Sequence, residues 1–99
     1  MDTNSNELEQ YLMKLDSKGF KFKDDAISFI YFGKQLTGAN DFLVSTAIEW
    51  TLKTQKSFDG SFYLSLLETL NANKISKKTE AVRLIEEIGL IKNNDQFSL

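Results

Sequence analysis

Apolar residues recur at helical spacing along most of the chain, and this periodicity constrains the fold more than any other feature of the sequence. The first instance places four apolar residues at positions i, i+3, i+4 and i+7, namely Leu8, Tyr11, Leu12 and Leu15. A stripe of this kind covers one face of a helix and has to be buried against another element. Residues 20–23 alternate like a strand, but no second alternating segment exists to pair with them, so we expect a packed loop there.

Small and polar residues mark the ends of the helices, because the chain contains no proline. Glycine stands at three positions suited to a left-handed C-cap: Gly19, Gly38 and Gly89. A side chain that can cap a helix N-terminus stands at three others: Asn40, Asp59 and Ser76. These signals predict helices over about residues 5–17, 25–37 and 41–55, a fourth that contains residues 62–70, and a fifth over about residues 77–88.

Four or five short amphipathic helices joined by short turns specify a compact all-α bundle, since each apolar stripe needs another to cover it. With 99 residues, 41% of them apolar, the chain has room for one hydrophobic core. We therefore expect a single all-α domain over residues 1–91. The last residues, 92–99, have little periodicity, and we expect them to form a frayed tail.

The chain contains no histidine and no cysteine. These absences exclude a Ser-His-Asp triad, a thiolate nucleophile, an iron–sulfur cluster and a zinc site with cysteine ligands. Adjacent acidic residues at 24–25 and 86–87 point about 100° apart around a helix and do not converge. Residues 33–38 have the glycine spacing of a phosphate loop but lack the lysine and hydroxyl residue that must follow. We therefore expect no enzyme, no cofactor and no bound metal.

The charge balance and the absence of membrane signals bear on the partner and the compartment. Twelve basic residues against fourteen acidic ones give a net charge of −2, so no overall positive field attracts nucleic acid or anionic lipid. Residues 1–4 lack the basic and apolar stretches of a signal peptide, and every apolar run is too short to span a bilayer. We expect a cytoplasmic protein without a membrane partner.

Aromatic residues, 12% of the chain, give the main indication of a binding surface. Because Phe29, Ile30, Tyr31 and Phe32 are consecutive, a helix that carries them is apolar around nearly its whole circumference. Either this helix is the central one of the domain, or some of these side chains form an exposed interface. Trp50, one step off the main stripe of its helix, has the same two interpretations. The sequence thus predicts a non-catalytic interaction or regulatory module that binds another protein or a second copy of itself, with four candidate anchors: Phe29, Tyr31, Phe32 and Trp50.

Positive charge gathers around the predicted start of the fifth helix, at Lys74, Lys77, Lys78 and Arg83. Lys77 and Lys78 oppose the dipole of that helix, which points to another use such as phosphate contact. Ordinary solvated side chains explain the same pattern, and the net negative charge disfavours a nucleic-acid partner. These four residues are nevertheless the candidates for contact with nucleic acid.

The second half of the chain has a recognisable order of elements. Residues 44–48 form part of an amphipathic helix, residues 62–70 keep the apolar spacing Phe-Tyr-x-x-Leu-Leu-x-x-Leu, and an Asn-Lys-Ile-Ser turn follows at residues 73–76. Over residues 42–81 this order resembles the DnaD-like helical domain of Gram-positive replication-initiation proteins, although Leu70 stands where that family has tryptophan. The resemblance implies a bacterial all-α accessory domain that contacts DNA or other replication proteins near its lysine-rich end.

Overall fold

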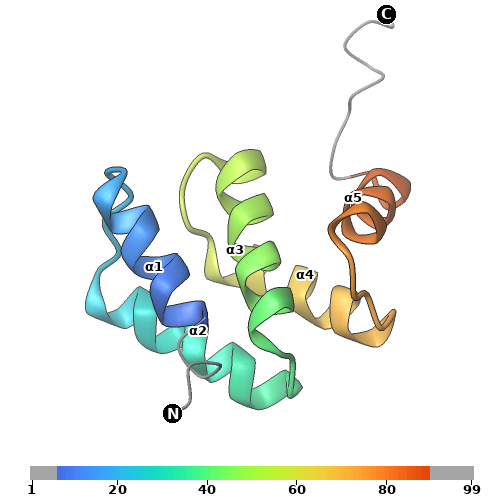
Figure 1. Cartoon of the computed structure of the whole chain (residues 1–99), viewed down its shortest axis with the longest axis horizontal. Coiled ribbons are helices and arrows are strands. Elements are labelled where there is room, and N and C mark those ends of the chain that lie inside the picture. Colours follow the sequence, from blue (N-terminus) through green and yellow to red (C-terminus); the bar gives the residue numbers. More distant parts are fainter. Residues whose placement is uncertain (1–6, 90–99) are drawn as a thin grey trace, which may run out of the picture.

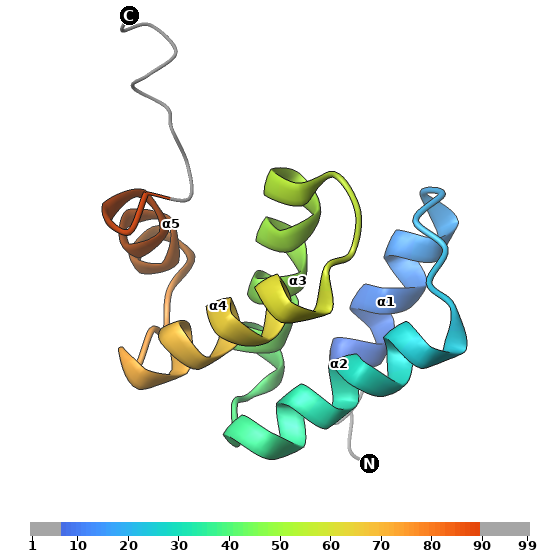
Figure 2. The ribbon, with the colours of Figure 1, turned by 180° about the vertical axis from the view of Figure 1, so that it is seen from behind.

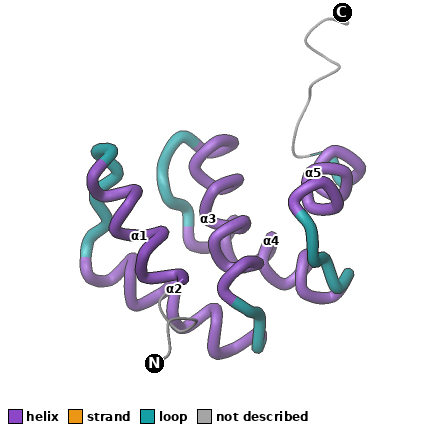
Figure 3. Tube along the Cα trace, viewed as in Figure 1, coloured by secondary structure: helices purple, strands orange, loops and turns teal. Residues whose placement is uncertain are grey.

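The computed structural model describes residues 7–89, and this part of the chain is helical without any strand. Its helices, shown in Figure 1, are α1 (Glu7–Ser17), α2 (Asp24–Thr37), α3 (Asp41–Gln55), α4 (Gly60–Ala72) and α5 (Lys78–Glu87). The prediction of a compact all-α bundle is confirmed. As Figure 3 shows, short loops join the helices, including the expected loop over residues 20–23. The predicted tail over residues 92–99 and the first residues of the predicted helix 5–17 lie outside the described part.

Local capping explains where α3 and α4 begin. The side chain of Asn40 accepts a hydrogen bond from the backbone N–H of Leu43 at 2.9 Å, and that of Asp59 accepts one from the N–H of Phe62 at 3.0 Å. Gly38 ends α2 in the left-handed conformation, with φ at 74°. Each of these residues satisfies backbone groups that a helix end leaves unpaired, so these predictions from sequence are confirmed.

The start of α5 differs from the prediction. Ser76 does not cap the helix, which begins at Lys78 without a side-chain N-cap. Instead the Glu80 carboxylate accepts the backbone N–H of Ser76 at 3.0 Å, and this hydrogen bond lowers the pKa of Glu80. The carboxylate therefore organises, from inside the helix, the turn that precedes α5.

The central helix is α3, which packs against α1, α2 and α4 (Figures 1 and 2). The interpretation that places the helix over residues 25–37 at the centre is therefore wrong. Small and medium side chains let neighbours approach α3 on several sides, and Thr46, Ala47 and Thr51 are all buried. The Thr51 hydroxyl donates to the carbonyl of Ala47 at 2.7 Å, so its burial leaves no unsatisfied polar group.

The helices α2 and α4 cross closely at Gly33. A Cβ atom at this position would lie only 2.9 Å from Cε2 of Tyr63, so the crossing depends on the missing side chain. The buried Tyr63 hydroxyl donates to the carbonyl of Ile30 at 2.8 Å, and burial raises the pKa of this phenol far above its usual value. Gly33, which has the spacing of a phosphate loop in the sequence, therefore serves helix packing.

One buried carboxylate joins three helices. Asp41, at the start of α3, accepts the backbone N–H of Leu8 in α1 at 3.1 Å and pairs with the Lys34 ammonium of α2 at 2.8 Å. The first N–H groups of a helix have no partner within that helix. Asp41 therefore acts as a cap for α1 that is supplied from another helix, and it fixes the first turn of α1 on α3.

Candidate interaction surface

The exposed apolar side chains concentrate on one edge of the domain. Of the six large hydrophobic residues that are exposed in the described part, five lie on α1, on α2 or in the loop between them: Met13, Phe20, Tyr31, Phe32 and Leu36. The sixth, Ile88, follows α5 at the other end of the domain. Exposed apolar side chains that gather on neighbouring elements are candidates for a binding surface.

The geometry of α2 explains why its aromatic residues divide between core and surface. Successive helical residues turn by about 100°, so four consecutive apolar residues cannot all face the same neighbour. Ile30 is buried and Phe29 is half-buried, with its ring against Gly60 and 6.2 Å from that of Tyr63. Tyr31 and Phe32 remain 38% and 52% exposed.

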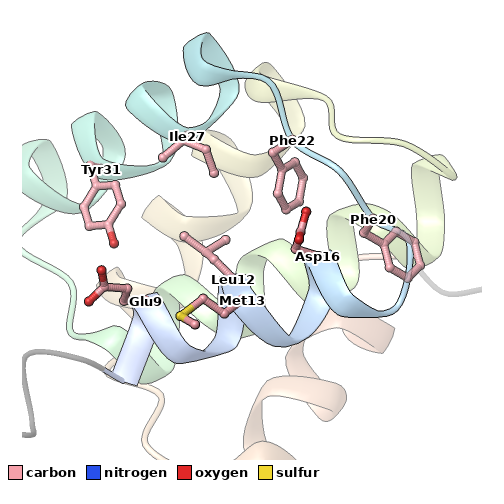
Figure 4. A pocket seen from close by; sticks show the side chains of 8 residues that line it. All are labelled: Glu9, Leu12, Met13, Asp16, Phe20, Phe22, Ile27 and Tyr31. Carbon is pink, nitrogen blue, oxygen red and sulfur yellow. The ribbon is translucent and has the colours of Figure 1, made fainter.

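Tyr31 lines an open groove between α1 and α2, with a volume of about 470 Å³. Figure 4 shows α1 along one side, α2 along the other, and the loop that joins them closing one end. The groove exists because α1 packs mainly on α3 and makes few contacts with α2. Its lining is mostly apolar and consists of Glu9, Leu12, Met13, Asp16, Phe20, Phe22, Ile27 and Tyr31.

A carboxylate stands toward each end of the groove (Figure 4). Asp16, near Phe22, pairs with Lys21 at 3.2 Å on the surface. Glu9, near Tyr31, forms no ion pair within residues 7–89. The pKa of Tyr31 is raised by partial burial and then by the negative charges of Glu9 and Asp41.

The four candidate anchors do not form a single surface. Tyr31 lines the groove, Phe32 is exposed outside its lining with its ring 5.8 Å from that of Phe29, and Phe29 lies in the contact between α2 and α4. Trp50 lies on α3, half-buried, with the ammonium of Lys53 4.5 Å from its ring centre. Of the four, Tyr31 and Phe32 are the ones that the structure leaves exposed.

The candidate nucleic-acid residues are all exposed, but acidic side chains lie among them. Lys74 and Arg83 line a shallow depression of about 270 Å³ together with Glu80 and Glu87. Lys78 pairs instead with Glu49 of α3 at 3.6 Å. Lys77 precedes α5 at the N-cap position. The structure therefore gathers these cations at one end of the domain without making a uniformly positive patch.

Sequence reasoning missed three of the exposed apolar residues on α1, on α2 and in the loop between them. Met13 directly follows Leu12 and so lies off the buried stripe of α1, a signal that was available in the sequence. Leu36 is exposed near the end of α2. Phe20 follows the left-handed Gly19, and its N–H donates to the carbonyl of Leu15 at 2.9 Å, which turns the chain back over α1. The ring of Phe20 is thereby placed at the end of the groove.

No group of histidine, cysteine, aspartate or glutamate residues suited to a metal ion occurs in the described part of the chain. None of the helices described is long and apolar enough to cross a membrane. The fold and the surface thus define a small all-α domain with an apolar groove between its first two helices.

The chain belongs to DUF6123, a family of unknown function, whose profile matches residues 3–91. No match was found among curated proteins or among solved structures.

Proposed function

We propose that this domain is a non-catalytic interaction or regulatory module that binds a protein partner through the edge formed by α1 and α2. The observation that carries the proposal is the concentration of exposed large apolar side chains on that edge. Burying a fully exposed side chain of this size contributes about 1.5–3 kcal/mol. These side chains are partly exposed, so a partner gains a fraction of that from each one and needs to cover several of them. Tyrosine and phenylalanine are frequent anchors at such interfaces.

The partner is another protein or a second copy of the chain, and we place both in the cytoplasm. Catalysis has no part in the proposal, because the chain lacks the histidine and cysteine side chains that most nucleophilic and acid–base mechanisms use. Light scattering over a range of protein concentrations distinguishes the two kinds of partner. A dimer indicates self-association, whereas a monomer directs the search to bacterial lysate.

Tyr31→Ala and Phe32→Ala test the surface itself. Both side chains are exposed, so we expect the variants to keep a helical circular-dichroism spectrum while association with the partner or with a second copy weakens. Ile88→Ala is the matched control, since it removes an exposed apolar side chain at the other end of the domain. Association that is unchanged in both α2 variants would contradict the proposal.

Association with DNA is the second candidate function, supported by four exposed cations around the start of α5: Lys74, Lys77, Lys78 and Arg83. Its test is a gel-shift titration at several salt concentrations. Phosphate contacts release counterions, so binding through these residues weakens steeply as salt rises. Absence of binding at low salt would exclude this function.

A further inference from the structure

The groove between α1 and α2 offers few hydrogen-bonding groups to a ligand. Apart from apolar side chains, its lining contains the carboxylates of Glu9 and Asp16 and the hydroxyl of Tyr31. Away from their first and last turns, the backbone groups of α1 and α2 are paired within the helices themselves. An extended or polyproline segment in this groove would bring carbonyl groups that find almost no donors.

A helix does not have this difficulty, because its backbone hydrogen bonds are internal. Residues 7–89 contain no strand, so the domain presents no sheet edge to which an extended peptide could add. The length of the groove also suits contact with about two turns of a helix. Glu9 and Asp16 are seven residues apart on α1, which corresponds to about 10 Å or two helical turns.

The negative charge of Glu9 at one end of the groove favours a partner with a positive charge at that position. Glu9 has no ion pair within the described residues, whereas Lys21 already pairs with Asp16 at the other end. A second copy that inserts the exposed face of its α2 would bring a single cation, Lys34, which is already paired with Asp41 at 2.8 Å. A second copy that docks through α2 therefore leaves Glu9 without a counterion, whereas a basic segment of another protein supplies one.

We infer that the groove between α1 and α2 binds an amphipathic helix of another protein, whose apolar stripe enters the groove and whose lysine or arginine lies against Glu9. This inference rests on the proposed function and specifies its partner. The apolar residues of such a helix recur at i, i+3 or i+4, and i+7, a spacing that matches the two helical turns between Glu9 and Asp16.

The first experiment selects ligands from a random phage-displayed library of peptides of about 16 residues, or roughly four helical turns. Selection uses the full chain, and Met13→Glu serves as the groove variant, because Met13 is 66% exposed and its replacement leaves the core intact. The expected peptides have apolar residues at helical spacing, carry lysine or arginine near one end, and lose binding to the Met13→Glu variant.

The outcomes separate this inference from the proposed function. Peptides that bind the groove but are extended, proline-rich or acidic would overturn the inference and leave the interaction module standing. If no selected peptide depends on Met13 or Tyr31, the inference fails, and the proposed function is then decided separately by the association of the Tyr31→Ala and Phe32→Ala variants. Peptides of the expected kind support both.

Charge reversal then tests the contact with Glu9. Glu9→Lys should weaken binding of a selected basic peptide about fivefold at low salt, and a peptide with glutamate in place of its basic residue should recover the loss. Glu9→Gln should act in the same direction with a smaller effect, and it guards against damage to the first turn of α1. Glu68→Lys, an equal change in net charge on the exposed face of α4, is the control. Equal effects of Glu9→Lys and Glu68→Lys, or no effect of Glu9→Lys, would overturn the assignment of Glu9.

Discussion

At the scale of single residues, Gly33 shows how one absent atom sets a helix crossing. Gly33→Ala should gain about 1 kcal/mol of helix propensity but lose about 1–3 kcal/mol to overpacking, since the new Cβ would lie 2.9 Å from the buried ring of Tyr63. The hydrogen bond from Tyr63 to Ile30 keeps that ring from retreating. We expect the free energy of unfolding in urea, followed by circular dichroism, to fall by about 1 kcal/mol.

The control for Gly33→Ala removes the ring of Tyr63 that the new Cβ would meet. In the background of Tyr63→Leu, the branched side chain leaves room for a methyl group, so Gly33→Ala should no longer destabilise the protein. A single Gly33→Ala variant that is more stable than the wild type would show that the ring can move aside and that the crossing does not require glycine.

Two phenols, the half-buried Tyr11 and the buried Tyr63, make the stability of the protein sensitive to alkali. Burial, reinforced by the charge of Glu49, raises the pKa of Tyr11 from 10.0 to about 12, and burial raises that of Tyr63 further still. A raised phenol pKa means that the fold favours the neutral form. The contribution to stability is therefore complete below pH 10.0, the pKa of the unfolded group, and is lost as the pH rises through the folded-state value.

We expect the free energy of unfolding to fall as the pH rises from about 10 toward 12, and the fall to be smaller in Tyr11→Phe and Tyr63→Phe. At neutral pH, Tyr63→Phe should also cost about 1–2 kcal/mol, because the carbonyl of Ile30 loses its buried partner. Urea unfolding at a series of pH values measures both effects. Lysines titrate in the same range, so the difference between wild type and each variant is the informative quantity. Parallel curves for wild type and variants would contradict the assignment to these phenols.

At the scale of elements, Asp41 controls the attachment of α1. Asp41→Ala leaves the N–H of Leu8 and the ammonium of Lys34 without their buried acceptor, and should cost about 3 kcal/mol. Asp59→Ala removes a cap that serves its own helix and should cost about 1 kcal/mol. Urea unfolding compares the two variants, and hydrogen exchange should show the additional loss of protection in α1. Similar costs for both variants would mean that Asp41 contributes no more than a local cap.

The contrast between a cap within one helix, as at Asp59, and a cap supplied from another helix, as at Asp41, explains which features of the helices the sequence could predict. The caps at Asn40 and Asp59 act within three residues along the chain, so local pattern was sufficient to predict them. The central position of α3 depends on how many neighbours surround a helix, which the pattern of one helix does not contain. Thr46 and Thr51 look like surface residues, yet both are buried, and the hydroxyl of Thr51 bonds to its own helix.

At the scale of the whole molecule, the candidate surface was predictable only in part. The aromatic run at residues 29–32 indicated that some apolar side chains face outward, and Tyr31 and Phe32 are exposed in the structure. The groove itself was not predictable, because it depends on α1 packing on α3. The contact between Leu8 and Asp41 that holds this arrangement spans 33 positions of the sequence, which no local periodicity encodes.

The same long-range organisation predicts that the two ends of the domain differ in stability. The helix α5 packs sparsely on the rest of the domain, with Ala81 and Ile85 as its buried side chains. Its ion pair between Lys78 and Glu49 is largely exposed on the Lys78 side and contributes less than about 1 kcal/mol. We expect the amide hydrogens of α5 to exchange through a local opening of lower free energy than those of α3, measured by native-state hydrogen exchange at increasing urea concentrations.

Ile85→Ala tests this opening and its separation from the groove. The substitution removes a fully buried side chain, so it should lower the opening free energy of α5 by about 2–4 kcal/mol while protection in α1 and α2 stays close to that of the wild type. Because Figure 1 places α5 at the opposite end of the molecule from α1, a ligand of the groove should still bind this variant. If the amide hydrogens of α5 and α3 instead exchange together in a single global unfolding event, the domain is one cooperative unit. Ile85→Ala would then weaken protection and ligand binding throughout the domain.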